Sequence, residues 1–430
     1  MWVALSNWFS RAGSLAAQLV CLPLLSTLLT PKEFAAYAIA VSLMTWYQLC
    51  DMGFGNSTQN HVAEARARNE EIGTLVATAC VLAAIVMVVA LVLLGPLSYW
   101  LNTALLGPIG LPATNRPQLM LWLSGVMFVG YALGTIGQKM LYAMQKGIYA
   151  NIISLVNSFA FLGLLWGVTR QVATEDRLLA SVLAYTLPMG LTGVSTLVYL
   201  AVKYARWDVK VITVQFSKLR VRAWRFWIMA IFSTGVTNVD YLVMSRTLSA
   251  DDIAAYNVLF RVFWAGMALY AGVLSAAWPV FSALGVHGDF ASINRHIRLY
   301  LIAGFGALLL GVAIMAANLP TLLNWLAPGL HIQVTFITLA LFATYIGLRI
   351  WSDTYAVALQ ALNDMNIFII VAPIQAVITI IAEFTLSKIW GINGILMGLI
   401  TSYILTAVWV LPWKFKQLSQ HKLTDENSLL

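Results

Sequence analysis

Six charged residues lie inside long apolar stretches of the chain, where a charge is costly and usually serves a function. They are Arg11, Asp51, Asp240, Arg261, Arg349 and Asp353. An arginine guanidinium presents a planar set of donors that matches the oxygens of phosphates and carboxylates. A carboxyl group in apolar surroundings favours its protonated form and can therefore carry a proton. These residue types favour binding of an anionic ligand and coupling to an ion.

The arginines are the candidates for substrate binding. Arg261 is the strongest, because it lies about nine residues into its apolar stretch, near mid-membrane at about 1.5 Å per residue. Arg349 is four residues before Asp353, so the two share a helical face. Either Arg349 contacts an anionic ligand, or the two charges neutralise each other. Arg11 lies in the inner third of the first apolar stretch.

The acids Asp51, Asp240 and Asp353 are the candidates for gating or ion coupling. Asp51 lies at a depth similar to that of Arg11, and the two either form a structural ion pair or contribute to a gate or a phosphate contact. Asp240 has no basic residue three or four positions away. It either meets an arginine of another helix, with Arg261 as the candidate, or serves as a protonation site.

Other polar residues of the apolar stretches are weaker candidates. Three glutamines could line a polar cavity: Gln18, Gln138 and Gln375. Three charged residues are expected at the membrane interface: Lys32, Glu383 and Lys388. Cys21, Cys50 and Cys80 have no metal-ligand spacing and are expected to be small buried side chains. No metal and no cofactor is predicted.

The composition predicts the elements that must position these residues. Of the 430 residues, 60% are hydrophobic and 10% are charged, and the mean hydropathy is +0.82. Soluble proteins carry about 25% charged residues. The apolar stretches are continuous over about 20 residues, which excludes the alternating strands of a membrane barrel. The predicted fold class is an all-α polytopic membrane protein.

Twelve transmembrane helices are expected, some of them long enough to tilt. They cover 5–29, 33–58, 73–101, 117–142, 148–169, 177–202, 222–247, 252–281, 295–318, 333–360, 366–387 and 393–412. If the N-terminus is cytoplasmic, most of the 25 lysines and arginines fall on the inner side. This bias predicts that both termini are cytoplasmic.

Two similar octets divide the chain near its middle. Thr30–Tyr37 reads TPKEFAAY and Ser249–Tyr256 reads SADDIAAY, and each has a hydroxyl N-cap with an acid three residues later. The repeat predicts two six-helix lobes, related by a pseudo-two-fold axis along the membrane normal. The predicted domains are residues 1–202, a basic cytoplasmic linker at 203–221, residues 222–413 and a cytoplasmic tail at 414–430. The linker lies on anionic lipid or recognises an anionic head group.

The segment from Asp51 to Asn60, DMGFGNSTQN, is followed by EARAR at 64–68. Together with the octet ending at Tyr37, it resembles the polysaccharide transport family of the multidrug/oligosaccharidyl-lipid/polysaccharide (MOP) exporters, in particular O-antigen (Wzx-type) flippases. The resemblance implies two six-helix lobes around a central cavity. It also implies movement of an undecaprenyl-diphosphate-linked oligosaccharide from the cytoplasmic to the periplasmic leaflet of a bacterial inner membrane. The implied partners are that lipid, the membrane lipids, and the polymerase and chain-length proteins of the same pathway.

We therefore expect a transporter rather than an enzyme, working by alternating access. A cation-coupled multidrug antiporter of the same superfamily is the main alternative, although it would favour a net acidic cavity. A membrane O-antigen polymerase or ligase would need a large outer loop, and the expected outer loops are short. The chain has no G-x-x-x-x-G-K-[ST] motif for ATP, and no nucleic-acid partner is expected.

Overall fold

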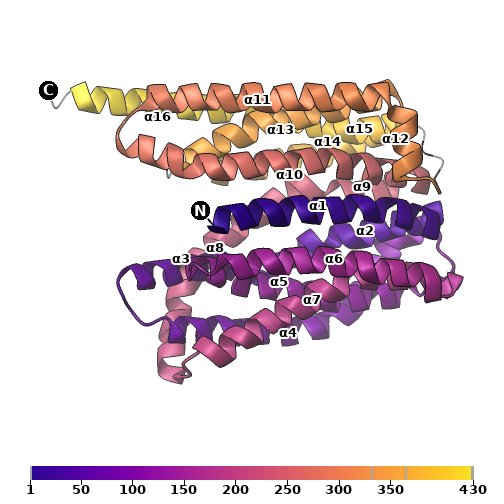
Figure 1. Ribbon diagram of the computed structural model, residues 1–430, viewed down its shortest axis with the longest axis horizontal. Coiled ribbons are helices and arrows are strands. Elements are labelled where there is room, and N and C mark those ends of the chain that lie inside the picture. Colours follow the sequence, from indigo (N-terminus) through magenta and orange to yellow (C-terminus); the bar gives the residue numbers. More distant parts are fainter. Residues whose placement is uncertain (1, 331, 333, 363, 365, 428–430) are drawn as a thin grey trace. The chain divides into compact units, whose positions relative to one another are not determined.

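The computed structural model describes residues 2–330, 332, 334–362, 364 and 366–427. Every regular element among these residues is helical (Figure 1). The chain divides into two compact units. Unit 1 comprises residues 1–234, 249–254 and 326–331, and unit 2 comprises 235–248, 255–325 and 332–430. The proposed domain limits at 202 and 222 stay a prediction.

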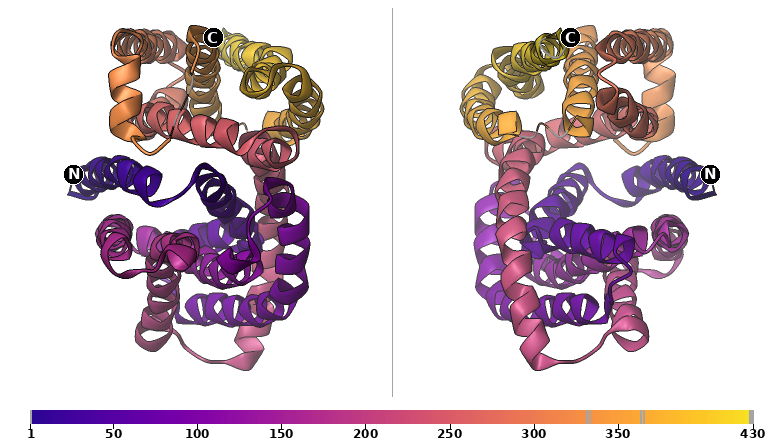
Figure 2. Two further views of the ribbon diagram at one scale, coloured as in Figure 1. Left: turned by 90° about the vertical axis from the view of Figure 1, so that its right-hand side faces the viewer. Right: turned by 90° about the vertical axis from the view of Figure 1, so that its left-hand side faces the viewer.

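Unit 1 holds the first seven long helices and most of the eighth. They are α1 (Trp2–Leu28), α2 (Pro31–Tyr47), α3 (Phe54–Ala67), α4 (Gly73–Leu101), α5 (Pro117–Ala143), α6 (Gly147–Gln171), α7 (Arg177–Tyr204) and α8 (Val209–Asn238). Figure 2 shows the amino-terminal part of α8 lying crosswise to helices of unit 1 that are seen end-on. The 203–221 segment is therefore largely helical.

Unit 2 holds the remaining helices. They are α9 (Asp240–Thr247), α10 (Ala250–Val286), α11 (Phe290–Ala317), α12 (Leu319–Leu326), α13 (Phe336–Ala361), α14 (Asn366–Trp390), α15 (Ile392–Leu405) and α16 (Ala407–Asn427). The first residues of α10, up to Ala254, pack with unit 1.

Nine helices of the described chain are long and apolar enough to cross a membrane. The count becomes ten if α8 and α9, which meet at an angle of 41°, form one bent span. The chain is therefore a polytopic α-helical membrane protein. The expected total of twelve spans, and the placement of both termini, stay predictions.

The expected single span at 33–58 is wrong in one respect, because the helix ends at Tyr47. A 3-10 turn follows, and then Met52 and Gly53 adopt positive φ angles of 48° and 74° before α3 begins. The amide of Gly53 donates to Oδ1 of Asp51 over 2.8 Å. A Cβ atom on Gly53 would lie 2.2 Å from the carbonyl oxygen of Ala223 in α8, so this position needs a glycine for both conformation and space.

Both predicted helix caps are confirmed. The amide of Glu33 donates to Oγ1 of Thr30 over 3.4 Å, and the amide of Thr30 donates to Oε2 of Glu33 over 2.9 Å. At the second octet the amide of Asp252 donates to Oγ of Ser249 over 3.2 Å. Each cap satisfies backbone donors that the first helical turn leaves without a partner.

Glycines bring the central helices of unit 1 into close contact. A Cβ atom on Gly134 of α5 would lie 2.1 Å from Cα of Gly193 in α7, and one on Gly193 would lie 2.5 Å from the carbonyl oxygen of Gly130. Small residues spaced four apart allow such close packing between membrane helices. The contact fixes α5 against α7, and both helices contribute to the cavity described next.

Candidate functional site

Unit 1 contains a polar cavity of about 350 Å³. Its walls come from α1, α5, α6 and α7, with Met44 of α2. Hydroxyl and amide side chains dominate the lining: Asn7, Ser10, Ser14, Gln18, Gln138, Asn151, Ser154, Asn157 and Ser158. Four aromatic residues complete it: Tyr131, Tyr142, Phe161 and Tyr185. We call this the unit 1 cavity.

Asn151 organises the cavity wall between α1 and α6. Its Nδ2 donates to Oγ of Ser6 over 2.8 Å, and its Oδ1 accepts from the hydroxyl of Tyr142 over 2.5 Å. Its backbone carbonyl accepts from Oγ of Ser10 over 2.7 Å. The side chain is 3% exposed. These bonds satisfy polar groups that would otherwise be costly to bury, so the wall has a defined shape.

Arg11 is the one charged residue among the described side chains that line this cavity. It is half-buried, and its Nε donates to Oδ1 of Asn7 over 3.2 Å. The sequence placed Gln18 and Gln138 as cavity candidates, and both line it. The cavity therefore offers many neutral hydrogen-bonding groups, aromatic rings and one cation. That set suits a hydroxyl-rich ligand with an anionic group.

Asp51 has a different ion-pair partner from the one that the sequence suggested. Its Oδ2 lies 3.4 Å from Nζ of Lys139 in α5, and the aspartate is almost fully buried. The sequence had offered Arg11 as the partner of Asp51. Lys139 is the next residue after Gln138 on α5, and Gln138 lines the unit 1 cavity.

Asp240 is buried at the start of α9 in unit 2. Its Oδ2 accepts from the hydroxyl of Tyr256 in α10 over 2.5 Å, and its Oδ1 accepts from the amide of Tyr241 over 2.9 Å. Arg261, the suggested partner of Asp240, is half-buried on α10 and interacts electrostatically with Tyr241. The structure thus gives Asp240 a tyrosine donor.

Glu383 of α14 is fully buried among the helices of unit 2, and its expected depth near the membrane interface stays a prediction. Within the described chain, neither carboxylate oxygen has a hydrogen-bond partner. Its helix packs against α9, which carries Asp240, and Gly398 of α15 lies so close that a Cβ atom there would be 2.7 Å from the amide of Glu383. A sequence signal existed, because buried polar residues recur every four positions on α14: Gln375, Thr379, Glu383 and Ser387.

Arg349 and Asp353 form the self-neutralising pair that was one of the two sequence interpretations. Nη2 of Arg349 lies 3.1 Å from Oδ2 of Asp353. The guanidinium also stacks over the ring of Trp264 at 5.1 Å and donates to the hydroxyl of Tyr345 over 3.4 Å. The carboxylate, the indole and the phenol surround Arg349, so most of its donors are directed within unit 2.

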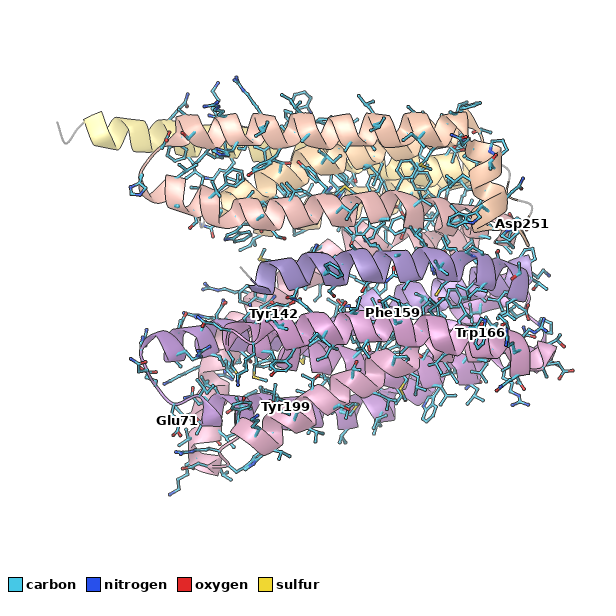
Figure 3. All side chains as sticks on the ribbon, viewed as in Figure 1. Glu71, Tyr142, Phe159, Trp166, Tyr199 and Asp251 are labelled. Carbon is cyan, nitrogen blue, oxygen red and sulfur yellow. The ribbon has the colours of Figure 1, made fainter. Side chains whose placement is uncertain are left out.

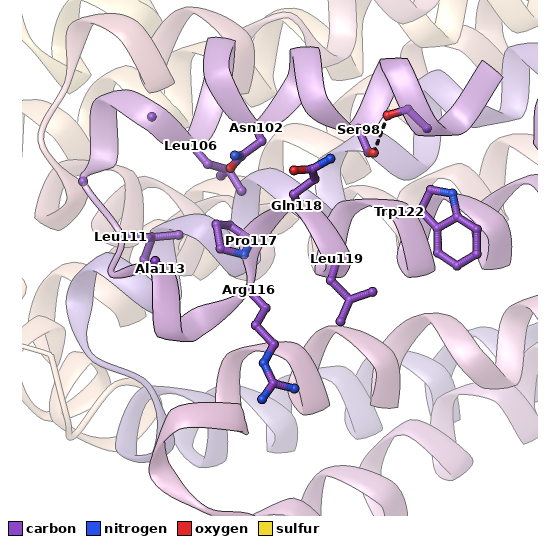
Figure 4. Close-up of a pocket in the computed structure, with 13 residues that line it drawn as sticks. Ser98, Asn102, Leu106, Leu111, Ala113, Arg116, Pro117, Gln118, Leu119 and Trp122 are labelled. Atoms are coloured by element: carbon purple, nitrogen blue, oxygen red, sulfur yellow. Dashed lines mark hydrogen bonds between the residues drawn. The ribbon is translucent and has the colours of Figure 1, made fainter. Parts of the chain in front are cut away.

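A second pocket of about 750 Å³ lies where α4 ends and α5 begins (Figure 4). Figure 4 shows the guanidinium of Arg116 pointing away from the amides of Asn102 and Gln118. Arg116 lies 3.9 Å from Asp176 instead. The pocket is open, and its lining residues include no cluster of charges. The unit 1 cavity and the buried acids of unit 2 are therefore the better candidates for the functional site.

Comparisons with known proteins show the family of the chain. Residues 5–284 match the family model described as "Polysaccharide biosynthesis protein". The chain is 26% identical to a "Putative O-antigen export protein" of Yersinia pseudotuberculosis, over 99% of this chain and 97% of the relative. It is 28% identical to a "Putative O-antigen transporter" of Salmonella typhimurium, over 95% of each chain.

Two solved structures show the same fold. An inward-facing multidrug resistance MATE family transporter of the MOP superfamily superposes with a TM-score of 0.74 at 12% identity, covering 97% of this chain and 99% of that one. The lipid II flippase MurJ in an inward closed conformation superposes with a TM-score of 0.72 at 14% identity, covering 98% and 91%.

Proposed function

The chain belongs to the polysaccharide biosynthesis protein family, in the polysaccharide transport branch of the MOP superfamily, and we propose that it is a flippase for a lipid-linked oligosaccharide. It is a membrane transporter and not an enzyme. The proposed substrate is an undecaprenyl-diphosphate-linked O-antigen or similar repeat unit. It would pass from the cytoplasmic to the periplasmic leaflet of a bacterial inner membrane by alternating access.

The unit 1 cavity is the observation that carries this proposal. Its hydroxyl and amide groups can exchange hydrogen bonds with sugar hydroxyls, and its tyrosines offer ring faces. Arg11 can offset part of a diphosphate charge, since a guanidinium binds phosphate oxygens in a bidentate manner. Arg261 is proposed as a further contact for the head group. Arg349 is a weaker candidate for that role, because Asp353 already neutralises it.

The multidrug antiporter alternative is disfavoured by the same cavity. A site for organic cations should offer carboxylates, and the described lining of the unit 1 cavity offers an arginine. The relatives that align along nearly the whole chain carry names of O-antigen export, which supports a glycan cargo.

Ion coupling is proposed at the buried acids of unit 2. Asp240 accepts a hydrogen bond from Tyr256, and Glu383 is fully buried on α14, the helix that packs against α9. A carboxylate buried in apolar surroundings is costly, so these acids favour binding of a proton or another monovalent cation. Occupation of the pair would then bias the conformational equilibrium. Asp51 and Asp353 are proposed to act in gating through their pairs with Lys139 and Arg349.

The remaining parts of the proposal concern architecture. We propose twelve spans, two six-helix lobes with limits at 1–202 and 222–413, a basic linker at 203–221 and both ends of the chain in the cytoplasm. The polymerase and the chain-length proteins of the same pathway are proposed partners. The charge bias and the repeated helix caps support this arrangement.

Replacement of lining residues in the unit 1 cavity tests the function. In a strain that lacks the native gene, Arg11→Gln or Gln138→Leu should reduce surface glycan about tenfold, with lipid-linked repeat units accumulating on the cytoplasmic face. Gln118→Leu, an exposed amide of the other pocket, is the matched control and should export normally. Wild-type glycan display by both cavity variants, at equal protein levels, would remove the cavity from the proposal.

A further inference from the structure

Two lysines and three tyrosines gather at one end of unit 1, on a surface that no step above uses. They are Lys146, before α6, Tyr149 on α6, and Tyr199, Lys203 and Tyr204 at the end of α7. We call this group the tyrosine–lysine cluster. Figure 3 shows Tyr199 toward the same end of the unit as Glu71 and Tyr142, whereas Trp166 lies toward the other end.

The cluster is held together by contacts between its cations and its rings. Nζ of Lys146 donates to the hydroxyl of Tyr204 and lies 4.8 Å from the centre of that ring. Nζ of Lys203 lies 5.3 Å from the ring of Tyr199 and 5.9 Å from that of Tyr204. The two rings meet edge to face at 6.2 Å. Both ammonium groups therefore approach Tyr204, one from the turn between α5 and α6 and the other from α7.

Neither Lys146 nor Lys203 forms an ion pair with a carboxylate among the described residues. Glu71, on the segment before α4, is engaged by Arg206, whose Nη1 donates to it over 2.7 Å. The two ammonium groups thus keep N–H donors for an anion, and the hydroxyl of Tyr204, which accepts from Lys146, can donate its own proton.

The surface next to the cluster indicates what kind of anion fits. Exposed aliphatic side chains continue from the cluster along α6 and α7: Ile152, Val156, Val198 and Val202. Val202 is 83% exposed, directly before Lys203. In a membrane protein such a surface contacts acyl or prenyl chains. A ligand that meets both regions has an apolar chain and an anionic head.

We infer that the tyrosine–lysine cluster is a binding site for the phosphate group of a membrane lipid. Lys146 and Lys203 contact the phosphate oxygens, the tyrosine hydroxyls donate to it, and the apolar chain lies along α6 and α7. Ordinary snorkelling would bring each lysine to the interface alone, whereas here a lysine of the α5–α6 turn and a lysine of α7 both lie at the ring of Tyr204. The phosphate belongs either to the diphosphate of the transported lipid, which rests on the proposed function, or to a glycerophospholipid.

Lipid retention by the purified full-length protein tests the site. Native mass spectrometry would compare a polyprenyl diphosphate, phosphatidylglycerol and, as a lipid without phosphate, diacylglycerol. Lys146→Gln combined with Lys203→Gln should weaken retention of the phosphate lipids about 25-fold, since each lysine near an anionic head group contributes about 1 kcal/mol. The matched control is Lys388→Gln, an exposed lysine that lies 3.9 Å over the ring of Phe384, and it should retain them normally.

The pattern of losses identifies the source of the phosphate. If the double glutamine variant retains less polyprenyl diphosphate only, the cluster is assigned to the substrate. If it retains less of both phosphate lipids, the cluster is assigned to phosphate groups in general. The double variant with Lys146→Arg and Lys203→Arg keeps both charges and should retain binding. The proposal is overturned if the double glutamine variant retains the phosphate lipids as well as the wild type does. It is also overturned if Lys388→Gln weakens lipid retention equally, or if the double arginine variant weakens it. Surface glycan is a separate readout, so the proposed function can fail while this site stands.

Discussion

Glu383 and Asp240 are the residues whose burial most demands a chemical explanation. A buried carboxylate without hydrogen bonds costs several kcal/mol, so such a group is expected to be protonated or to meet a cation. Asp240 has a tyrosine donor, whereas Glu383 has no hydrogen-bond partner in the described part of the chain. The helices that carry the two acids, α9 and α14, pack against each other. Two buried acids on packed helices are therefore the candidates for binding a coupling ion.

Neutral variants of these acids should uncouple export from ions. Asp240→Asn and Glu383→Gln keep the side-chain shape but remove the charge, so export should lose its dependence on an imposed proton or sodium gradient. We expect about a tenfold fall in export under a gradient, measured with lipid-linked repeat units in vesicles. Asp364→Asn is the comparison, because Asp364 pairs with Lys414 at 3.4 Å and is not among the coupling candidates, so this variant should keep the gradient dependence. If both variants of unit 2 keep the wild-type gradient dependence, coupling resides elsewhere.

The sequence predicted some of the residues of the candidate site. Arg11, Gln18 and Gln138 were singled out as polar groups in apolar stretches, and the fold brings all three to one cavity. The sequence did not predict which charged residues pair with each other. Lys139 is far from Asp51 in sequence, and the packing of α5 against the 3-10 turn at Gln48–Asp51 brings them together. The burial of Glu383 did not follow from the sequence, because hydropathy gives depth along a helix but does not tell which face meets another helix.

At the scale of elements, the close contact of α5 with α7 positions two walls of the unit 1 cavity. Gly134 and Gly193 permit this contact, because any side chain would force the helices apart. The helix limits themselves followed well from the apolar stretches: α4, α5, α6 and α7 begin and end within a few residues of the expected spans. The glycine contact did not follow, since spacing alone does not identify the facing helix.

Gly134→Ala should destabilise the protein through this contact. The new Cβ would lie 2.1 Å from Cα of Gly193, and backbone atoms cannot move aside without separating the helices. We expect a loss of about 2 kcal/mol, seen as a lower melting temperature of the detergent-solubilised protein. The matched control is Gly163→Ala on α6, where nothing lies within 4 Å. It should be neutral or slightly stabilising. Equal melting temperatures for both variants would contradict the close contact.

At the scale of the whole chain, the number of spans depends on whether the helices that carry polar groups are counted as spans. α2 has 17 residues, and α13 carries Arg349 and Asp353, so neither is among the nine helices of clear membrane character. Both helices are nevertheless rich in buried residues. Helices that line a polar interior are the ones that hydropathy underestimates, because their polar residues face other helices and not lipid. The proposed twelve spans include them.

Cysteine labelling decides the topology that the charge bias predicts. Cys21, Cys50 and Cys80 would first be replaced by alanine, and single cysteines introduced as Thr114→Cys, Thr174→Cys, Trp207→Cys or Gln420→Cys. The wild-type residues at these four positions are exposed. A membrane-impermeant maleimide should label positions 114 and 174 from the periplasm, and positions 207 and 420 only after the inner membrane is opened.

The expected pattern follows from the basic residues, which accumulate on the cytoplasmic side of inner-membrane proteins. Position 207 tests this most directly, because Lys203, Arg206 and Lys210 surround it. If α2 with α3, or α13, did not cross the membrane, the positions after it would exchange sides. Labelling of position 420 from the periplasm would then indicate an odd number of spans, and labelling of 174 and 207 from the same side would remove α7 from the count.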